Sequence, residues 1–251
     1  MMTYLIYFLL GLFAGRILRI IISCLPENQK IFSFQFCPKC GTKLRFFEMM
    51  SGISYLVDGG HCRQCGQLFI LHKPIVELLT GILFVLCHAM FDSSLYMLKA
   101  LIFTSFLIVI SFIDYDHSLI YDKVLLPMAI LGISLNLFIG GIKLPDMLIA
   151  GLLGGSIFLV LALVSKGGFG GGDIKFMASI GLWLGVKDTI LCVLLSFIFG
   201  GLGAAVLLLL REKTMKDKFP YAPYIALASF ITLLYGDFLV TWYYNWAFQV
   251  K

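Results

Sequence analysis

The sequence predicts an all-α membrane protein that crosses the bilayer about eight times. Of its 251 residues, 60% are apolar and only 13% are charged, whereas an ordinary soluble protein has about 45–50% apolar residues and about 25% charged ones. Several apolar runs approach or exceed the roughly 20 residues that cross a hydrocarbon core. The 19 basic and 14 acidic residues are too few to disperse a domain of this size in water. This excludes a soluble enzyme, a disordered regulator and a secreted disulfide scaffold.

Helices are the expected element of each span, since an open sheet edge leaves backbone polar groups unsatisfied in lipid. The predicted spans are 3–25, 75–91, 95–113, 124–140, 148–165, 174–186, 189–210 and 221–244. Glycine-rich stretches at 151–155 and 200–203 predict close helix packing. The predicted domains are a first transmembrane helix (1–25), a small zinc-ribbon-like insert (26–73) and a multi-span domain (74–251).

Lysine and arginine set the orientation of these spans. If the insert faces the cytoplasm, that side carries 13 of the 19 basic residues: Lys30, Lys39, Lys43, Arg45, Arg63, Lys73, Lys123, Lys166, Lys175, Arg211, Lys213, Lys216 and Lys218. The other side holds only Lys99, Lys143, Lys187 and Lys251. The positive-inside rule therefore predicts a multi-pass protein of the inner, cytoplasmic membrane with both termini outside. The net charge of +5 reflects this topology, so no nucleic-acid partner is predicted.

The first 25 residues have a second interpretation as a cleaved signal, because Ile21-Ile22-Ser23-Cys24 resembles a lipoprotein cleavage site. Signal peptides carry their positive charge before the apolar stretch. No lysine or arginine precedes Arg16, so an uncleaved span is predicted.

Four of the seven cysteines predict a structural zinc site. Cys37 and Cys40 form one Cys-x-x-Cys-Gly pair, and Cys62 and Cys65 form another. Two such pairs are typical of a tetrahedral all-thiolate Zn²⁺ site. Disulfides are disfavoured in a reducing cytosol, and His61 is not needed because four thiolates complete the shell. A closed four-ligand site is structural rather than catalytic.

Two aspartates at span ends are the candidate catalytic residues. Asp114 ends the third span and Asp173 opens the sixth. An acid retained at the edge of a span is costly and is a functional candidate by default, and two acids at one face can share a proton as general acid and general base. Asp116 and Asp122 are alternatives to Asp114, while Asp173 has the simpler roles of pairing with Lys175 or capping its helix. The remaining loop aspartates are interpreted as solvated: Asp58, Asp92, Asp146, Asp188, Asp217 and Asp237.

Five stretches of the sequence resemble motifs of the type IV prepilin peptidase family, and they occur in the same order along the chain. Members of this family are polytopic aspartic proteases with a Gly-x-Gly-Asp motif. The five stretches are the two cysteine pairs, Lys73-Pro74-Ile75-Val76-Glu77, Phe112-Ile113-Asp114 followed by Leu119-Ile120-Tyr121-Asp122, Gly170-Gly171-Gly172-Asp173-Ile174-Lys175, and Phe219-Pro220-Tyr221-Ala222-Pro223-Tyr224. The resemblance covers nearly the whole chain.

The resemblance implies that Asp114 and Asp173 are the catalytic pair. It also makes Gly170, Gly172, Lys175 and Glu77 the candidate substrate-binding residues, since each lies in a matching stretch. Members of the family remove the short basic leader from type IV prepilins or pseudopilins at the cytoplasmic face of the membrane. Many also methylate the new N-terminus with S-adenosylmethionine, and the protease motifs are kept here more fully than the motifs on the methylation side.

Two other classes of function are also compatible with these residues. A transporter would use intramembrane acids and glycine-broken helices, but it predicts acids near the midplane and repeat symmetry. A pilus or secretion assembly scaffold would use the zinc-binding insert for docking, and its aspartates would be dispensable.

Overall fold

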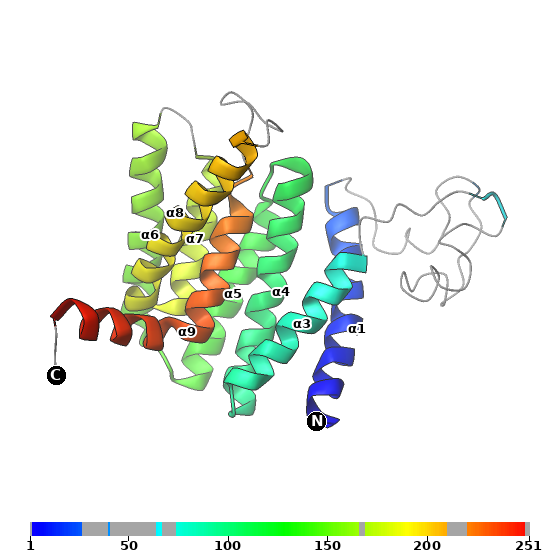
Figure 1. Ribbon diagram of the computed structural model, residues 1–251, viewed down its shortest axis with the longest axis horizontal. Coiled ribbons are helices and arrows are strands. Elements are labelled where there is room, and N and C mark those ends of the chain that lie inside the picture. The colour runs from blue at the N-terminus through cyan, green and yellow to red at the C-terminus, as the bar shows by residue number, and fades with distance from the viewer. Residues whose placement is uncertain are drawn as a thin grey trace. The chain divides into compact units, whose positions relative to one another are not determined.

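The computed structural model describes residues 2–26, 40, 64–66, 74–165, 169–209 and 220–248, and the regular structure in these ranges is entirely α-helical (Figure 1). The chain divides into two compact units, Met1–Ala89 and Met90–Lys251. The predicted all-α class is thereby confirmed for the described part of the chain.

The first unit contains α1 (Met2–Cys24) and α3 (Pro74–Met90). Glycines let the two backbones approach closely. A Cβ added at Gly11 would lie 2.6 Å from the Gly81 Cα, and one added at Gly15 would lie 2.7 Å from the Glu77 Cα. Small residues at such contacts are typical of helix packing in membranes.

The described residues of the second unit form a bundle of six helices: α4 (Ser94–His117), α5 (Asp122–Ile139), α6 (Leu144–Val164), α7 (Gly171–Leu184), α8 (Val186–Leu209) and α9 (Ala222–Phe248). The helices alternate in direction, so α4, α6 and α8 finish at one end of the bundle, from which α5, α7 and α9 start (Figure 1). We call this the upper end. The opposite end is called the lower end.

Six of the helices are long and apolar enough to cross a membrane, namely α1, α4, α5, α6, α8 and α9. Helix α3 is apolar but shorter, and α7 has only 14 residues. At 1.5 Å per residue, α7 is about 21 Å long, which is less than the roughly 30 Å of a hydrocarbon core. A multi-pass membrane protein is therefore confirmed, while the count of eight spans stays a prediction.

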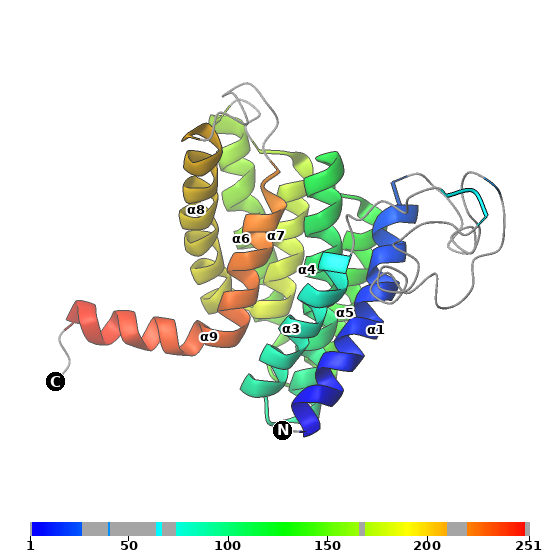
Figure 2. The ribbon, with the colours of Figure 1, turned by 45° about the vertical axis from the view of Figure 1, so that its right-hand side comes forward.

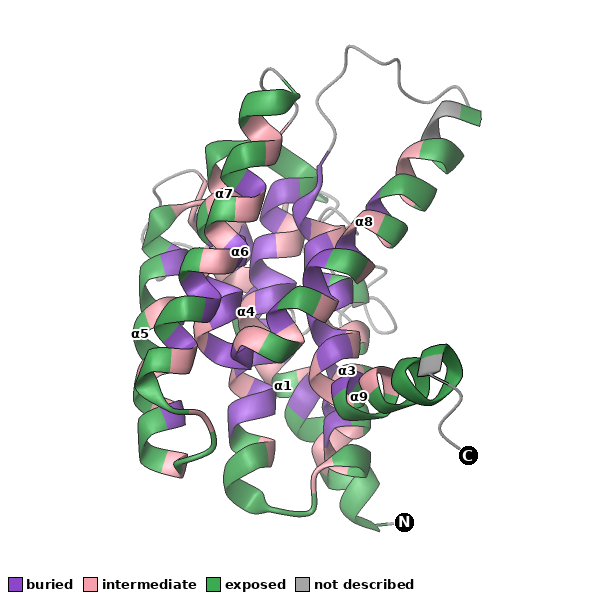
Figure 3. Ribbon diagram, turned by 90° about the vertical axis from the view of Figure 1, so that its left-hand side faces the viewer, coloured by how far each residue is buried: buried purple, intermediate pink, exposed green. Residues whose placement is uncertain are grey.

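Helix α7 is central to the second unit because it packs against α5, α6, α8 and α9. Its contact with α6 is especially close. A Cβ added at Gly181 would lie 2.5 Å from the Ala150 carbonyl oxygen, and one added at Gly151 would lie 3.1 Å from the Ala178 carbonyl oxygen. The close packing predicted for 151–155 is thus confirmed. Figure 3 shows that buried residues lie along the faces that the helices turn toward one another.

Helix α9 ends in an exposed aromatic segment. Trp242, Tyr243, Tyr244 and Trp246 are all exposed, and Figures 1 and 2 show the last part of α9 turning away from the other helices of its unit. Tryptophan and tyrosine are enriched where a membrane meets water. The composition of this segment is therefore typical of a helix at the membrane–water interface.

Candidate functional site

Asp114 lies in the last turn of α4 and is only 6% exposed. The helix ends at His117 and is capped by Ser118, whose φ of 52° is left-handed and whose N–H donates to the Asp114 carbonyl oxygen. The side chain is held from a second direction, because the backbone N–H of Ala222 donates to Asp114 Oδ2 at 3.0 Å. Ala222 is the first residue of α9, where a helix leaves its N–H groups without intrahelical partners. Asp114 therefore supplies a hydrogen-bond acceptor for a backbone N–H group at the start of α9.

Asp173 lies in the first turn of α7 and is 8% exposed. Its Oδ2 accepts a hydrogen bond from the backbone N–H of Gly170 at 3.0 Å, while its own N–H donates to the Gly170 carbonyl oxygen. This reciprocal arrangement confirms the helix-capping interpretation. Within the described part of the chain, no residue donates a hydrogen bond to Asp173 Oδ1.

The two acids interact at the upper end of the bundle. Asp173 lies outside the six helices long enough to cross a membrane. Burial raises the pKa of Asp173 to about 6, the hydrogen bond from Gly170 opposes this rise, and the negative charge of Asp114 adds to it. A buried carboxyl near a second carboxylate is the arrangement in which one acid holds a proton that the other lacks.

Aromatic rings pack beside the acids. The Tyr221 ring lies 4.9 Å from the Phe169 ring and 6.0 Å from the Phe158 ring, measured between centroids. The Tyr221 hydroxyl donates to the Ser196 carbonyl oxygen at 2.9 Å, and Gly200 leaves room for its ring. These contacts join α6, α8 and the residues before α7 and α9, so they hold the segment before Asp173 and the segment before Ala222, the partner of Asp114. They also confirm close packing at 200–203.

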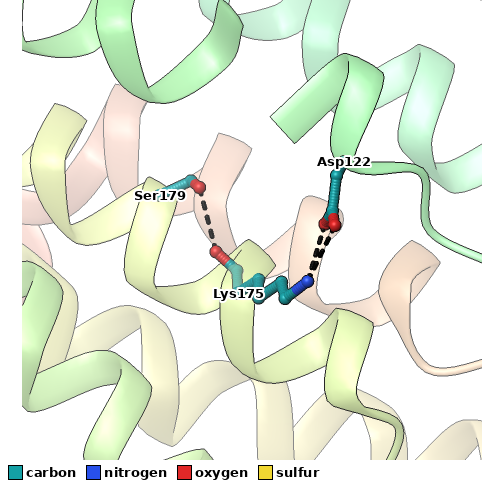
Figure 4. A network of polar contacts seen from close by, with 3 residues as sticks. All are labelled: Asp122, Lys175 and Ser179. Atoms are coloured by element: carbon teal, nitrogen blue, oxygen red, sulfur yellow. Dashed lines mark hydrogen bonds and ion pairs between the residues drawn. The ribbon is translucent and has the colours of Figure 1, made fainter. Parts of the chain in front are cut away.

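Lys175 forms an ion pair with Asp122, the first residue of α5 (Figure 4). The Lys175 Nζ lies 2.9 Å from Asp122 Oδ1 and 2.8 Å from Asp122 Oδ2. Pairing of Lys175 with Asp173 was the simpler interpretation of the sequence, and it is wrong, because the lysine reaches across to α5. The side chains of the pair are 60% and 67% exposed, and exposed pairs contribute about 0–1 kcal/mol.

The three candidate acids between α4 and α5 differ in burial. Asp114 is buried, Asp116 is exposed, and Asp122 is exposed and bound to Lys175. Of the three, Asp114 is the one that is buried and held by a hydrogen bond from the start of another helix. The role of the start of α9 as a hydrogen-bond donor to Asp114 was not predicted from the sequence. The available signal was the pair of prolines at 220 and 223, because proline is typical of the start of a helix.

Glu77, a candidate substrate-binding residue, lies on α3 in the first unit. Its Oε1 lies 3.5 Å from Arg19 Nη1 on α1, and both side chains are largely buried, at 14% and 12% exposed. Glu77 therefore neutralises a basic residue within the first unit. Its role toward a substrate stays a prediction.

Of the four candidate zinc ligands, Cys37 and Cys62 lie outside the described residues. Cys40 and Cys65 lie in turns, and Gly66 follows Cys65 with a φ of 66°. This left-handed turn fits the second half of a Cys-x-x-Cys-Gly zinc knuckle. Within the described ranges, no group of three histidine, cysteine or acidic side chains is close enough together to hold a metal ion. Zinc binding by the four cysteines therefore stays a prediction.

A buried polar cluster at the lower end was missed by the sequence analysis. Lys99 was counted among the basic residues of the outer side, but it is buried on α4 and donates to Asn136 Oδ1 on α5 at 2.6 Å. Asp188 was interpreted as solvated, yet its Oδ1 is buried and has no hydrogen bond within the described part of the chain. The available signal was the presence of a lysine and an asparagine inside predicted spans, where polar residues are costly.

The apolar helices of the second unit bring two buried carboxyl groups, those of Asp114 and Asp173, to the upper end of the bundle. The fold and the site together define a multi-span membrane protein with a pair of candidate catalytic acids. Comparison with known proteins identifies the family. A model of the type IV leader peptidase family matches residues 101–205, and a model of the bacterial peptidase A24 N-terminal domain matches residues 9–91. The chain belongs to the type IV leader peptidase family.

Curated relatives carry the name prepilin leader peptidase/N-methyltransferase. The Aeromonas salmonicida protein is 33% identical over 87% of this chain and 78% of its own length. The Pseudomonas aeruginosa protein is 31% identical over 95% of this chain and 92% of its own length, and the Bacillus subtilis protein is 34% identical over 84% and 85%. No solved structure matches the chain.

Proposed function

We propose that this protein is a membrane aspartic endopeptidase that removes the short basic leader from type IV prepilins or pseudopilins. The observation that carries the proposal is the buried pair of Asp114 and Asp173 at one end of the bundle. Membership in the type IV leader peptidase family and the names of the matching relatives support it. The distribution of lysine and arginine in the sequence supports a cytoplasmic position for the acids in an inner membrane.

In the proposed reaction, Asp114 acts as base and Asp173 as acid. Asp114 removes a proton from water as the water oxygen attacks the scissile carbonyl carbon, and Asp173 donates its proton to the carbonyl oxygen. The diol then collapses. Its hydroxyl returns a proton to Asp173, the C–N bond breaks, and Asp114 protonates the leaving nitrogen. The raised pKa of Asp173 supports its assignment as the protonated partner.

The surroundings of the acids suit an extended substrate that enters from water. A Cβ added at Gly171 would meet no atom of the described residues within 4 Å, so within the described part of the chain the start of α7 has an open side next to Asp173. We assign Gly170, Gly172 and Lys175 to the surface that the cleavage segment contacts. The apolar helix of a prepilin would then lie in lipid while its leader stays in water.

A transporter is less well supported. Carriers hold their coupling acids near the middle of interrupted helices. Asp114 and Asp173 lie instead in the last turn of α4 and the first turn of α7. This position favours chemistry at the edge of the membrane.

The direct test is incubation of the purified full-length protein, in lipid vesicles, with a prepilin and S-adenosylmethionine. The mass of the product should decrease by the mass of the leader, and it should increase by one methyl group where methylation follows. Mass spectrometry of the new N-terminus measures both events and the position of the cut. An intact prepilin, or a cut at another bond, would contradict the proposal.

Methylation is the second half of the proposed activity, and S-adenosylmethionine would supply the methyl group. The names of the relatives support it. The side chains within the described ranges form no site that we assign to this cofactor, so no step is derived through it.

Zinc is proposed to be held by Cys37, Cys40, Cys62 and Cys65, where it would stabilise the insert without taking part in cleavage. Replacing Cys37 or Cys62 with serine should therefore remove the bound zinc and reduce methylation more than cleavage. Zinc content by atomic emission, measured beside both activities, checks this. Cys87→Ala, a change in the buried part of α3, should keep its zinc. Equal and complete loss of both activities at normal protein levels would contradict this division of roles.

A further inference from the structure

The lower end of α7 is bound to α5 by a fully buried asparagine. Helix α7 stops at Leu184, before Gly185, whose φ of 80° is left-handed. The last carbonyl groups of a helix need partners outside it. Asn136 supplies them, because its Nδ2 donates to the Leu182 carbonyl oxygen at 2.9 Å and to the Trp183 carbonyl oxygen at 3.3 Å.

Lys99 fixes the orientation of this amide. Its Nζ donates to Asn136 Oδ1 at 2.6 Å, and the lysine is only 8% exposed. Since the oxygen of Asn136 is occupied by Lys99, its nitrogen must face the carbonyl groups of α7. The lysine also interacts electrostatically with Asp188 on α8, which partly offsets its buried charge. The polar contacts therefore join α4, α5 and the end of α7.

Trp183 attaches the same end of α7 to α5 at a second point. Its Nε1 donates to the Met128 carbonyl oxygen at 2.8 Å, and its ring lies 5.0 Å from the Phe103 ring. Gly132 makes room for the indole, because a Cβ there would lie 2.5 Å from Nε1. We call Lys99, Asn136 and Trp183 the lower clamp.

We infer that the lower clamp sets the position of α7 along the bundle axis and thereby aligns Asp173 with Asp114 at the other end. Helix α7 is a single rod of 14 residues with Asp173 in its first turn. Movement of such a rod at its lower end is transmitted to its upper end. The Lys175–Asp122 pair at the upper end is exposed, so it is a weak restraint. The inference rests on the proposed peptidase function, and the clamp residues are positioning residues because none of them touches the acids.

The clamp is tested by Asn136→Asp, which preserves the volume and the acceptor for Lys99 but removes both N–H donors to α7. We expect the kcat for prepilin cleavage to fall about 10-fold, since a misplacement of about 1 Å costs up to about 10²-fold. KM should change less than about 2-fold, because the surface that binds the substrate is retained. Trp183→Phe, which keeps an aromatic ring but loses the N–H donor and part of the ring volume, should give a smaller change of the same kind.

Ser229→Ala is the matched control. It removes a buried contact between α8 and α9, in which Ser229 Oγ lies 3.2 Å from Cys192 Sγ, and it leaves the partners of α7 in place. This variant should keep its kcat. If it loses as much kcat as Asn136→Asp, general loosening of the bundle explains the effect and the inference is wrong.

A labelling measurement reads the position of α7 without using activity. Cysteine at position 171 fits among the described residues, because none of their atoms lies within 4 Å of an added Cβ there. We expect Asn136→Asp to change the rate at which a membrane-impermeant maleimide labels Gly171→Cys by several-fold, with the labelled peptide identified by mass. An unchanged labelling rate would overturn the inference even if cleavage were lost. A changed rate in a protein that never cleaves prepilin would support the clamp and refute the proposed function.

Discussion

Replacing either Asp114 or Asp173 with asparagine should lower the rate of prepilin cleavage by at least about 10³-fold, within the range that a general acid or base contributes. Asparagine keeps the shape of each side chain and one acceptor oxygen. It can therefore still accept the N–H of Ala222 at position 114 and the N–H of Gly170 at position 173. The fold and the start of both helices should survive, and only proton transfer should be lost. Initial rates in lipid vesicles, at equal protein content, measure this.

Asp116→Asn is the matched control, because it makes the same chemical change two residues from Asp114 at an exposed position. Surface substitutions usually change stability by less than about 0.5 kcal/mol, so its rate should stay close to that of the natural protein. The control also tests the assignment. Loss of cleavage in Asp116→Asn but not in Asp114→Asn would move the catalytic role to Asp116, and full activity of Asp173→Asn would refute the aspartic mechanism.

The sequence could predict the helices and the candidate acids because both follow from the cost of polarity in lipid. Apolar runs of about 20 residues predict spans wherever they occur. A carboxyl group kept at the end of a span, as at Asp114 and Asp173, stands out for the same reason. These inferences need only local sequence and composition, and no knowledge of which helices are neighbours.

The partners of those residues could not be predicted in this way. The donation from Ala222 to Asp114 joins positions 108 residues apart, and the partner of Lys175 is Asp122 on another helix rather than its near neighbour Asp173. For Lys99, the sequence predicted only the side of the membrane on which it lies. Its burial depends on Asn136 and Asp188 lying beside it, which only the packing of α4, α5 and α8 brings about.

A second large effect is expected at Gly172, where α7 meets the segment between α4 and α5. A Cβ at this position would lie 2.8 Å from the Ile120 Cβ and 3.2 Å from its Cγ1 and Cδ1. The Cβ of Ile120 is fixed to its backbone, so Gly172→Ala must displace either that segment or α7. Asp114 lies in the last turn of α4, just before this segment, and Asp173 follows Gly172 directly. We therefore expect cleavage to fall by about 10²-fold, the cost of about 1 Å of misplacement between reacting groups.

Gly171→Ala provides the comparison, since it adds the same methyl group one residue earlier in the same helix turn. In the part of the chain that the structure describes, no atom lies within 4 Å of the added Cβ, so cleavage should be nearly unchanged. Comparing initial rates of the two variants separates contact with Ile120 from any general effect of alanine in the glycine-rich turn. Equal losses in both would show that the turn itself needs glycine for substrate access. Unchanged cleavage in Gly172→Ala would show that the segment carrying Ile120 moves without disturbing the acids, and the tight approach of α7 to Ile120 would then have no part in aligning them.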